Sequence, residues 1–584
     1  MGIEPRILSF DIFEMDLKSR ELRRQGRLVP LQEKPFQLLA LLLKQPGEVV
    51  SREEIRQKLW ESDTHVEFDD NLNHAVRKVR QALGDSPDKP GFVETLSRRG
   101  YRFLVPVRTE LCSGDPIALG ASDAQDPPAL AVLPFLNVSS DPENEYFADG
   151  LTDELIHTLM NIGGLRVVGR TSSFQYKGKT HDLRLIGRQL GVSAVVEGSV
   201  RRDADMVLII AQLVNTTDGF HIWSGRYERA FRDVFAIQRE ISEGIAETLR
   251  IRLSRPLART LARRYTSNPE AYRLYLQAHA RLGKRSRDGL LEGRKLFVRL
   301  LELQPDYAPG LAGMAMTLIL SVQYELLRGA DVLPGAKEAA LRAIGLDPEM
   351  AEARTALAWL AGWFDWDHET AVRGFQSAIT LSPGWPTSHQ WLGEYLTVLG
   401  RQPEGVAEIN RALELDPIAP AANAILAFAL FHSRRFHEAI EQCRKTLETD
   451  SGFLMAHYFM AIAYEQLGQF DTALEELHKT QELWGPLEYR IERGVILSAA
   501  GSWHEVSSLL AEIASRGYAA RDYTGLNMAI IFGRLGDFPA AFNQLDASYE
   551  ERASALLYLN VDPRFDCLRC DERFGNLLKR IGLS

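Results

Sequence analysis

Residues 69–85 read DDNLNHAVRKVRQALGD, and this stretch decides how the first part of the chain folds. Its apolar residues recur at i, i+4, i+7 and i+11, so a helix places them on one face. They are Leu72, Val76, Val79 and Leu83. Asp69 or Asp70 is predicted to cap the start of this helix, and Gly84 is predicted to end it.

The opposite face of this helix carries polar and basic side chains. They are His74, Arg77, Lys78 and Gln81, with Arg80 at the border between the two faces. The major groove of DNA accepts one helix and offers hydrogen-bond acceptors to Arg. We therefore expect Arg77 and Lys78 to contact the groove and Arg80 to reach a phosphate. A solvated amphipathic helix is the alternative, and the helix alone does not exclude it.

A β-hairpin is predicted directly after the helix, because residues 92–96 alternate apolar and polar, residues 97–100 turn, and residues 101–103 return. Residues 77–108 hold eight basic and three acidic side chains, a net charge of +5, whereas the whole chain has a net charge of −10. A local basic patch on an acidic protein is typical of a DNA reader. Arg98 and Arg99 at the hairpin tip are expected to hold phosphates.

Residues 5–107 resemble the effector domain of OmpR/PhoB-type response regulators, a winged helix-turn-helix. The resemblance makes residues 72–83 the recognition helix and Thr95 to Phe103, ending in Gly-Tyr-Arg-Phe, the wing. The family often places Arg two residues after the wing Thr, where this chain has Ser97. The resemblance implies double-stranded DNA as partner, and relatives on repeated half-sites favour a homodimer on DNA. The implied DNA-binding residues are His74, Arg77, Lys78, Arg80, Gln81, Thr95, Arg98 and Arg99.

The length of 584 residues predicts several domains. The four cysteines are too few and too scattered for a disulfide framework, which fits a reducing compartment. The N-terminus carries no basic-then-apolar signal, and the most apolar run, residues 310–322, is too short to span a bilayer. We therefore expect a protein that acts in the cytoplasm and has no membrane partner, and the resemblance implies that it is bacterial.

The domain organisation follows from shifts in composition. Residues 1–108 form the winged helix, and residues 109–128 are rich in turn residues and read as a linker. Lys and Arg are absent between Arg108 and Arg166, so DNA contact is expected in the first domain alone. Residues 129–253 mix apolar strand patterns with helical ones and predict an α/β domain. Its segments 131–135, 147–155 and 195–200 resemble the TolB amino-terminal-like module.

No catalytic or metal motif is found in the sequence. The Gly-Lys-Thr at residues 178–180 has Ser173 where a phosphate loop needs Gly. Asp149, Asp153 and Glu154 are expected to complement the dipole of a helix start rather than to act as an acid/base pair. Cys567 and Cys570 lack a second cysteine pair, so zinc is not expected. The chain is predicted to be no enzyme, with no cofactor and no metal; a nucleotide-handling α/β enzyme is the third-ranked hypothesis.

A repeat period organises the chain from residue 268 to residue 584. Asp347-Pro348, Ser382-Pro383, Asp416-Pro417 and Asp450-Ser451 recur at a nearly constant interval, and the Leu-Gly pairs that begin at Leu399, Leu467 and Leu535 recur at twice that interval. Such a period, about 34 residues, is typical of tetratricopeptide repeats, whose stack leaves a concave surface for a peptide or partner helix. The interval from Pro305 to Pro348 is longer, which predicts an insertion or an atypical unit near residues 327–334. Trp359, Trp363 and Trp366 are more often core than groove lining at such spacing.

Together these patterns predict a multidomain α+β protein: a winged helix-turn-helix, then an α/β sheet domain, then an all-α tetratricopeptide solenoid. The expected function is a DNA-binding transcriptional regulator whose winged helix reads the major groove and whose solenoid senses a signal or recruits a protein partner. This order resembles CadC- and HilA-like regulators, with no receiver domain before the winged helix. The alternative is an interaction scaffold in which DNA binding is secondary.

Overall fold

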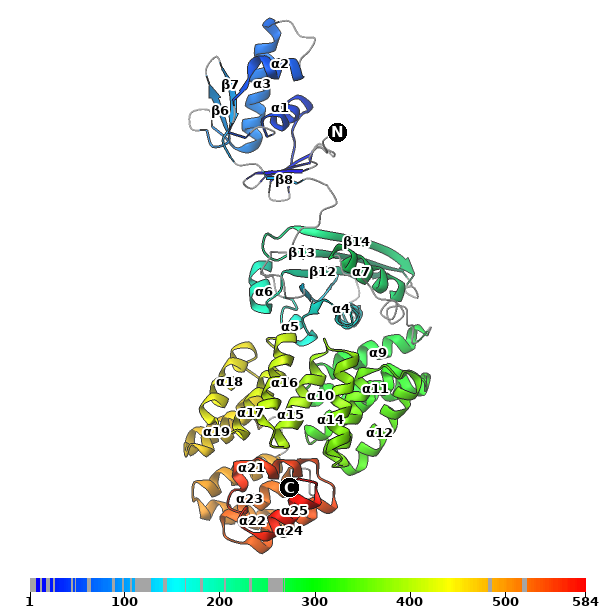
Figure 1. Ribbon diagram of the computed structural model, residues 1–584, viewed down its shortest axis with the longest axis vertical. Helices are drawn as coiled ribbons and strands as arrows, with labels where there is room; N and C mark the ends of the chain where they lie inside the picture. The colour runs from blue at the N-terminus through cyan, green and yellow to red at the C-terminus, as the bar shows by residue number, and fades with distance from the viewer. Residues whose placement is uncertain are drawn as a thin grey trace. The chain divides into compact units, whose positions relative to one another are not determined.

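The computed structural model describes residues 7–10, 13–16, 21–24, 27–43, 46–47, 49–59, 65–86, 90–96, 99–105, 108–110, 128–139, 144–162, 164–178, 182–203, 206–230, 234–249, 266, 268–481, 486–516 and 523–583. The chain separates into two compact units, residues 1–117 and residues 118–584 (Figure 1). Within the described residues, no helix combines the length and apolar character needed to cross a bilayer.

Among its described residues, the first unit contains three helices and two antiparallel sheets. The five-stranded sheet has the order β4-β3-β2-β1-β8, and the three-stranded sheet has the order β5-β7-β6. The elements are β1 (Ile7–Phe10), β2 (Phe13–Asp16), β3 (Glu21–Arg24), β4 (Arg27–Val29), α1 (Glu33–Leu43), β5 (Val49–Ser51), α2 (Arg52–Leu59), α3 (His65–Leu83), β6 (Val93–Leu96), β7 (Gly100–Phe103) and β8 (Arg108–Glu110). β8 pairs with β1, so the sheet of this unit continues past residue 108, after which the sequence predicts a linker.

The apolar stripe of α3 packs into the core of the first unit as its spacing predicts. Leu72, Val76, Val79 and Leu83 are 0%, 4%, 0% and 3% exposed. Gly84 ends the helix with a φ of +68°, a conformation that glycine adopts without steric cost. The predicted cap at Asp69 or Asp70 is wrong, because α3 begins at His65 and both residues lie inside it. An acid suits the first turns of a helix as well as its cap, so the sequence does not separate the two.

The second unit begins with a mixed α/β layer. Its sheet has the order β11-β9-β12-β13-β14, with β10 on β12; β9, β10, β11 and β12 are parallel, and β13 and β14 are antiparallel. The elements are β9 (Ala129–Val132), β10 (Leu136–Asn137), α4 (Glu145–Met160), β11 (Arg166–Val167), α5 (Arg170–Phe174), α6 (Leu183–Leu190), β12 (Ala194–Asp203), β13 (Met206–Asn215), β14 (His221–Ala230) and α7 (Val234–Thr248). Val196 packs with α4 and α7 on one face of the sheet, and Val195 packs with α6 on the other.

Paired helices make up most of the described residues from 269 onward (Figure 1). They are α9 (Pro269–Leu282), α10 (Arg287–Leu303), α11 (Ala308–Gln323), α12 (Gly329–Leu346), α13 (Ala351–Trp359), α14 (His368–Leu381), α15 (Pro386–Val398), α16 (Gln402–Leu415), α17 (Pro420–His432), α18 (Phe436–Thr449), α19 (Leu454–Gln466), α20 (Phe470–His478), α21 (Pro486–Ala499), α22 (Trp503–Arg516), α23 (Thr524–Arg534), α24 (Phe538–Glu550) and α25 (Glu572–Arg580), with a π-helix η3 (Leu360–Phe364) and 3₁₀ helices η4 (Ser554–Asn560) and η5 (Pro563–Phe565).

The period of the sequence corresponds to these helix pairs. Gly400, Gly468 and Gly536 turn the chain between paired helices with φ values of +82°, +75° and +78°. The long interval from Pro305 to Pro348 is taken up by α11 and α12, which have 16 and 18 residues, and by the segment between them. Trp359 and Trp363 are 1% and 2% exposed and belong to the core of the array, and Trp366 packs against that core.

The α/β layer docks on turns of the repeat array. Asp416, one of the periodic residues, accepts a hydrogen bond of 2.7 Å from the backbone N–H of Ser172 in α5. The hydroxyl of Ser172 in turn accepts a bond of 2.9 Å from the backbone of Ile418. Tyr272 and Leu276 of α9 complete the apolar core under α4. The periodic turn residues therefore join the two parts as well as spacing the repeats.

Ion pairs engage two of the three acids of α4 that were expected at a helix start, Asp149 and Asp153. Asp149 lies 2.6 Å from Lys177, and Asp153 lies 3.1 Å from Arg170 and 2.7 Å from His279 of α9. The assignment of these two acids to the helix dipole is wrong, because α4 begins at Glu145 and both residues lie beyond its first turn. Burial raises the pKa of Asp153, but Arg170 and His279 outweigh burial and hold that pKa below its usual value.

Candidate nucleic-acid interface

The exposed face of α3 presents the polar side chains that the sequence predicts. His74, Arg77 and Gln81 are exposed, and Lys78 is half-buried. The ammonium of Lys78 lies 3.4 Å from Oε1 of Gln81, one turn along the helix. Because the opposite stripe is fixed in the core, this face is held outward on a rigid element, as groove reading requires.

Arg80 links α3 to the hairpin instead of standing free. Its Nη2 donates to the carbonyl oxygen of Val93 and to Oγ1 of Thr95, both at 2.8 Å. Two of the eight residues named from the sequence, Arg80 and Thr95, are thus hydrogen-bonded to each other. Their contact sets the distance between the recognition helix and the wing, a role that the spacing of the sequence does not reveal.

Asp85 shapes the connection between α3 and the hairpin. Its carboxylate accepts hydrogen bonds from the backbone N–H groups of Ser86, Gly91 and Val93 at 3.0, 2.6 and 2.8 Å. The carboxylate therefore holds the backbone of this connection, because hydrogen bonds to a charged acceptor are stronger than those between neutral groups. Within the hairpin, Arg102 pairs with Glu94 at 2.6 Å.

A second cluster, which sequence reasoning missed, joins the start of α2 to α3 and the wing. Nη2 of Arg52 lies 3.2 Å from the hydroxyl of Tyr101 and 3.5 Å from Oδ1 of Asn73. The Tyr101 hydroxyl also donates to Oδ1 of Asn73 at 3.3 Å. An Arg at a helix start and a Tyr in a strand carry no sequence signal of contact, because they lie in separate elements far apart along the chain.

Gly100 allows the wing to pack against β5. It has a φ of +152°, and a Cβ at this position would lie 2.0 Å from the carbonyl oxygen of Val50. This close approach explains why glycine precedes Tyr101 in the Gly-Tyr-Arg-Phe segment. At the hairpin tip, Arg99 is exposed and its backbone N–H donates to Leu96 at 2.9 Å. Arg98 lies outside the described residues.

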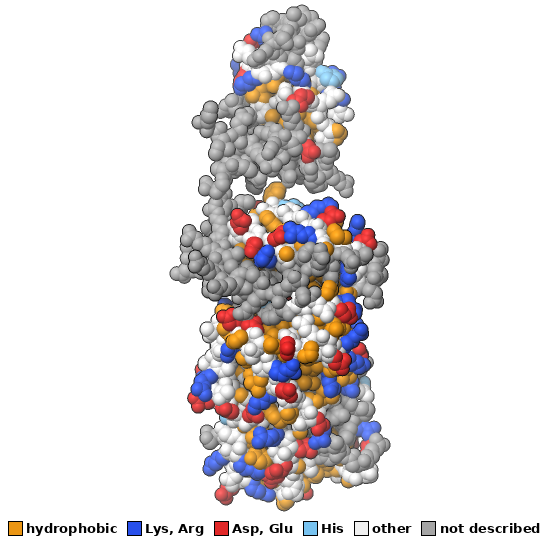
Figure 2. Space-filling view, turned by 90° about the vertical axis from the view of Figure 1, so that its right-hand side faces the viewer, with side chains coloured by type: hydrophobic (Ala, Val, Ile, Leu, Met, Phe, Trp, Pro, Cys, Tyr) orange, Lys and Arg blue, Asp and Glu red, His pale blue; other side chains and the backbone are white. Residues whose placement is uncertain are grey.

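Fewer basic side chains of residues 77–108 point outward in the structure than the sequence suggested. Arg80 and Arg102 are engaged inside the domain, which leaves Arg77, Lys78 and Arg99 as the outward basic side chains among the described residues 71–105. Basic and acidic side chains are interspersed on the side of the repeat array that Figure 2 presents. Within the described part of the chain, no group of three or more His, Cys, Asp or Glu is placed to hold a metal ion.

Comparison with known proteins assigns the first unit. Residues 26–103 match the family described as "Transcriptional regulatory protein, C terminal". The first unit is an OmpR/PhoB-type DNA-binding domain. In this domain α3 is the recognition helix and the β6–β7 hairpin is the wing. The resemblance of residues 129–253 to the TolB amino-terminal-like module stays a prediction.

Two relatives extend beyond this domain. The chain is 33% identical over 323 residues to "Putative adenylate cyclase 3" of Rhizobium meliloti (strain 1021), covering 55% of this chain and 52% of the relative. It is 22% identical over 421 residues to "Transcriptional regulator HilA" of Salmonella typhimurium, covering 71% of each chain. The chain thus spans about half the length of the first relative. Among solved structures, the Klebsiella pneumoniae RstA DNA-binding domain in complex with RstA box is 24% identical with a TM-score of 0.16, covering 17% of this chain and 97% of that one.

Proposed function

We propose that this chain is a transcription regulator that acts in the cytoplasm by binding rather than by catalysis. The observation that carries the proposal is the exposed face of α3, with His74, Arg77 and Gln81 outward, on an OmpR/PhoB-type domain. The HilA relative, whose alignment covers 71% of this chain at 22% identity, supports the same function.

Each named side chain takes a definite role in this proposal. Arg77 and Lys78 contact base edges in the major groove, where a good bidentate contact discriminates by about 1–3 kcal/mol. His74 and Gln81 flank them along the groove. Arg99 and Arg98 at the wing hold phosphates, which adds affinity that falls with salt. Arg80 and Thr95 keep the wing at the distance from α3 that lets both elements reach the duplex.

The second unit serves as the receiving part of the regulator in this proposal. Its α/β layer and repeat array would take a signal or a protein partner, and a homodimer on DNA would follow if the operator holds two half-sites. An interaction scaffold with secondary DNA binding is the competing function, and the interspersed charges of the array fit it as well.

The test measures binding of the full-length protein to the promoter region of its own operon. An Arg77→Ala, Lys78→Ala double variant is expected to bind at least about tenfold more weakly, because two cationic contacts are lost. The control is Arg373→Ala, Lys445→Ala, which removes the same charge from exposed positions on α14 and α18. Equal affinity and an equal salt slope for the first variant and wild type would contradict the proposal. A genome-wide pull-down that recovers no enriched sites would favour the scaffold.

A further inference from the structure

The concave face of the repeat array is partly filled by the chain's own C-terminal segment. Within this face, η4 contacts α15 and η5 contacts α23, and α15 and α23 are each the first helix of a pair. The ring of Tyr558 lies 5.6 Å from that of Phe428 and 5.8 Å from that of His432, and its hydroxyl is 3.1 Å from that of Tyr523. Asn560 donates to the carbonyl oxygen of Val398 at 2.9 Å. The C-terminal segment therefore occupies part of the concave surface on which a peptide was expected to bind.

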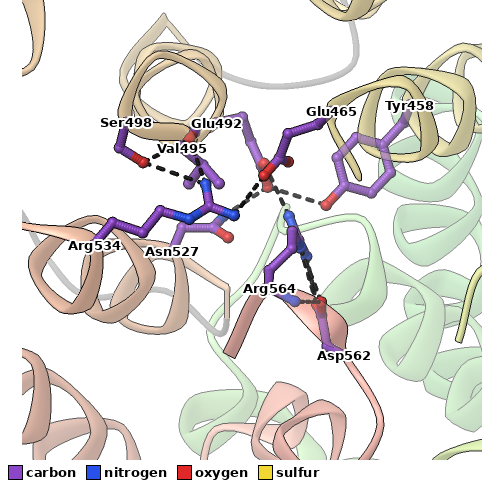
Figure 3. Close-up of polar contacts among 9 residues, drawn as sticks. All are labelled: Tyr458, Glu465, Glu492, Val495, Ser498, Asn527, Arg534, Asp562 and Arg564. Carbon is purple, nitrogen blue, oxygen red and sulfur yellow. Dashed lines mark hydrogen bonds and ion pairs between the residues drawn. The ribbon is translucent and has the colours of Figure 1, made fainter. Parts of the chain in front are cut away.

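Buried charges fix this segment in place, as Figure 3 shows. Asp562 and Arg564 are 1% and 9% exposed and pair at 2.8 Å. Arg564 also lies 3.7 Å from Glu492, which accepts hydrogen bonds from Tyr458 at 3.2 Å and Asn527 at 2.6 Å. Moving the segment away would leave buried charges unpaired, which is costly. The C-terminal segment is therefore a fixed part of the repeat array and forms one wall of its concave face.

A cavity of about 130 Å³ remains between this wall and the inner helices. Its lining includes the aromatic side chains of Trp391 of α15, Phe428 of α17 and Tyr458 of α19, together with charged side chains such as Arg285 and Arg564. An engineered apolar cavity of about 150 Å³ holds one benzene molecule, so the space suits a single aromatic ring with a short substituent.

Glu394 of α15 lines this cavity without a hydrogen-bond or ion-pair partner among the described residues, although Arg285 lines the same cavity. It is 5% exposed, and no hydrogen bond or ion pair of its carboxyl group is found among the described residues. Burial raises its pKa to about 7, although Arg285 partly opposes this effect. Glu492 and Asp562 in the same lining are paired. A buried acid that faces an open space instead of a partner is costly, and a cation in that space would relieve the cost.

His432 of α17 adds a neutral acceptor to the same lining. Its Nδ1 lies 2.9 Å from the carbonyl oxygen of Phe428 and must donate a proton to make that bond. Burial lowers the pKa of His432 to about 4, so the ring is neutral near pH 7. Nε2 is then the unprotonated nitrogen, an acceptor. Glu394 and His432 are therefore two of the acceptors in the lining, and Glu394 can carry a full negative charge.

We propose that this cavity binds a small aromatic amine, with its ammonium group against Glu394 and its ring among Trp391, Phe428 and Tyr458. The ammonium would form a charge-assisted hydrogen bond with the carboxylate, and aromatic faces attract cations. His432 would accept a second hydrogen bond from the ligand. A small aromatic amine would then be the signal that the second unit receives in the proposed function. Binding of the amine to this cavity does not require that the first unit binds DNA.

The test is isothermal titration of the full-length protein with 2-phenylethylamine, without DNA. The neutral isostere 2-phenylethanol is the matched ligand control. The amine is expected to bind saturably and at least about tenfold more tightly than the alcohol. Equal affinities, or no saturable binding of the amine at millimolar concentration, would overturn the proposal. Because DNA is absent, either result leaves the proposed DNA contacts untouched.

Two variants locate the site. Glu394→Gln keeps the shape of the side chain and removes its charge, so the amine should lose about 10- to 100-fold in affinity while the alcohol changes little. Glu302→Gln, at an exposed position on α10, is the control and should change neither. Ala424, which is 2% exposed, lines the cavity, and Ala424→Leu should fill it and weaken both ligands. Unchanged amine affinity in Glu394→Gln would refute the assignment even if the amine binds elsewhere.

The pH dependence of binding gives an independent check. Arg285, Tyr324 and Tyr558 are the charged or titratable groups that interact with Glu394 from neighbouring elements. Protons compete with the amine for the carboxylate below about pH 7, whereas the amine itself stays charged. Affinity should therefore rise roughly tenfold from pH 6 to pH 8. A flat profile in wild type, or the same rise in Glu394→Gln, would contradict the role of Glu394.

Discussion

The substitution Glu394→Gln tests the buried acid of the repeat array without any ligand. Burial raises the pKa of Glu394 from its ordinary 4.5 to about 7. Between these two values the folded protein keeps a proton that the unfolded chain releases, so the stability of the wild type falls as pH rises through this window. A gap of about 2.5 pKa units at 1.36 kcal/mol each corresponds to roughly 3 kcal/mol. Gln does not titrate and escapes this loss.

The expected result is a stability difference that grows with pH. Near pH 4.5 the two proteins should differ little, and at pH 8 the variant should be more stable by roughly 3 kcal/mol. Urea unfolding of the full-length chain at pH 5, 6.5 and 8, followed by tryptophan fluorescence, measures the difference, because Trp391 lies beside the cavity. Glu302→Gln should track the wild type at every pH. A Glu394→Gln difference that is constant with pH would refute the reasoning, since a mere packing effect does not titrate.

Two further predictions concern the winged helix. Gly100→Ala should destabilise the first unit by more than about 2 kcal/mol, because the added Cβ would lie 2.0 Å from the carbonyl oxygen of Val50; calorimetry should show a lower melting temperature for that unit alone. Arg80→Ala should remove two hydrogen bonds between α3 and the hairpin at about 1 kcal/mol each; hydrogen exchange should quicken in β6, and DNA affinity should fall while the salt slope stays the same.

The periodicity of the sequence predicted which face of a helix is buried, but not which residues of other elements its side chains contact. The stripe from Leu72 to Leu83 is buried and the opposite face is exposed, because a helix fixes direction at about 100° per residue. The same rule put Arg80 at the border of the faces. That it meets Val93 and Thr95 depends on where the hairpin lies, in another element further along the chain. Spacing within one element carries no information about the distance to the next.

The repeat period shows the same limit at the other end of the chain. It located the helix pairs and their Gly turns, because each unit must bury its apolar face against the next. The period alone does not say where the segment after the last repeat lies. In the structure, Asp562 and Arg564 lie within the concave face and meet Glu492, which belongs to the much earlier helix α21. The one sign of the cavity in the sequence is Glu394, which stands among the apolar residues Trp391, Leu392, Tyr395 and Leu396.

One helix connects the proposed ligand cavity to the α/β layer. α17 begins at Pro420, shortly after Asp416, and its inner side chains Ala424 and Phe428 line the cavity. Asp416 and Ile418 hold Ser172 of α5 through two hydrogen bonds. A ligand that shifted α17 would therefore have to strain these bonds, each of which leaves a buried polar group unpaired when broken. We therefore expect displacement of α17 at the cavity to weaken docking of the α/β layer, because the turn before α17 makes both hydrogen bonds with Ser172.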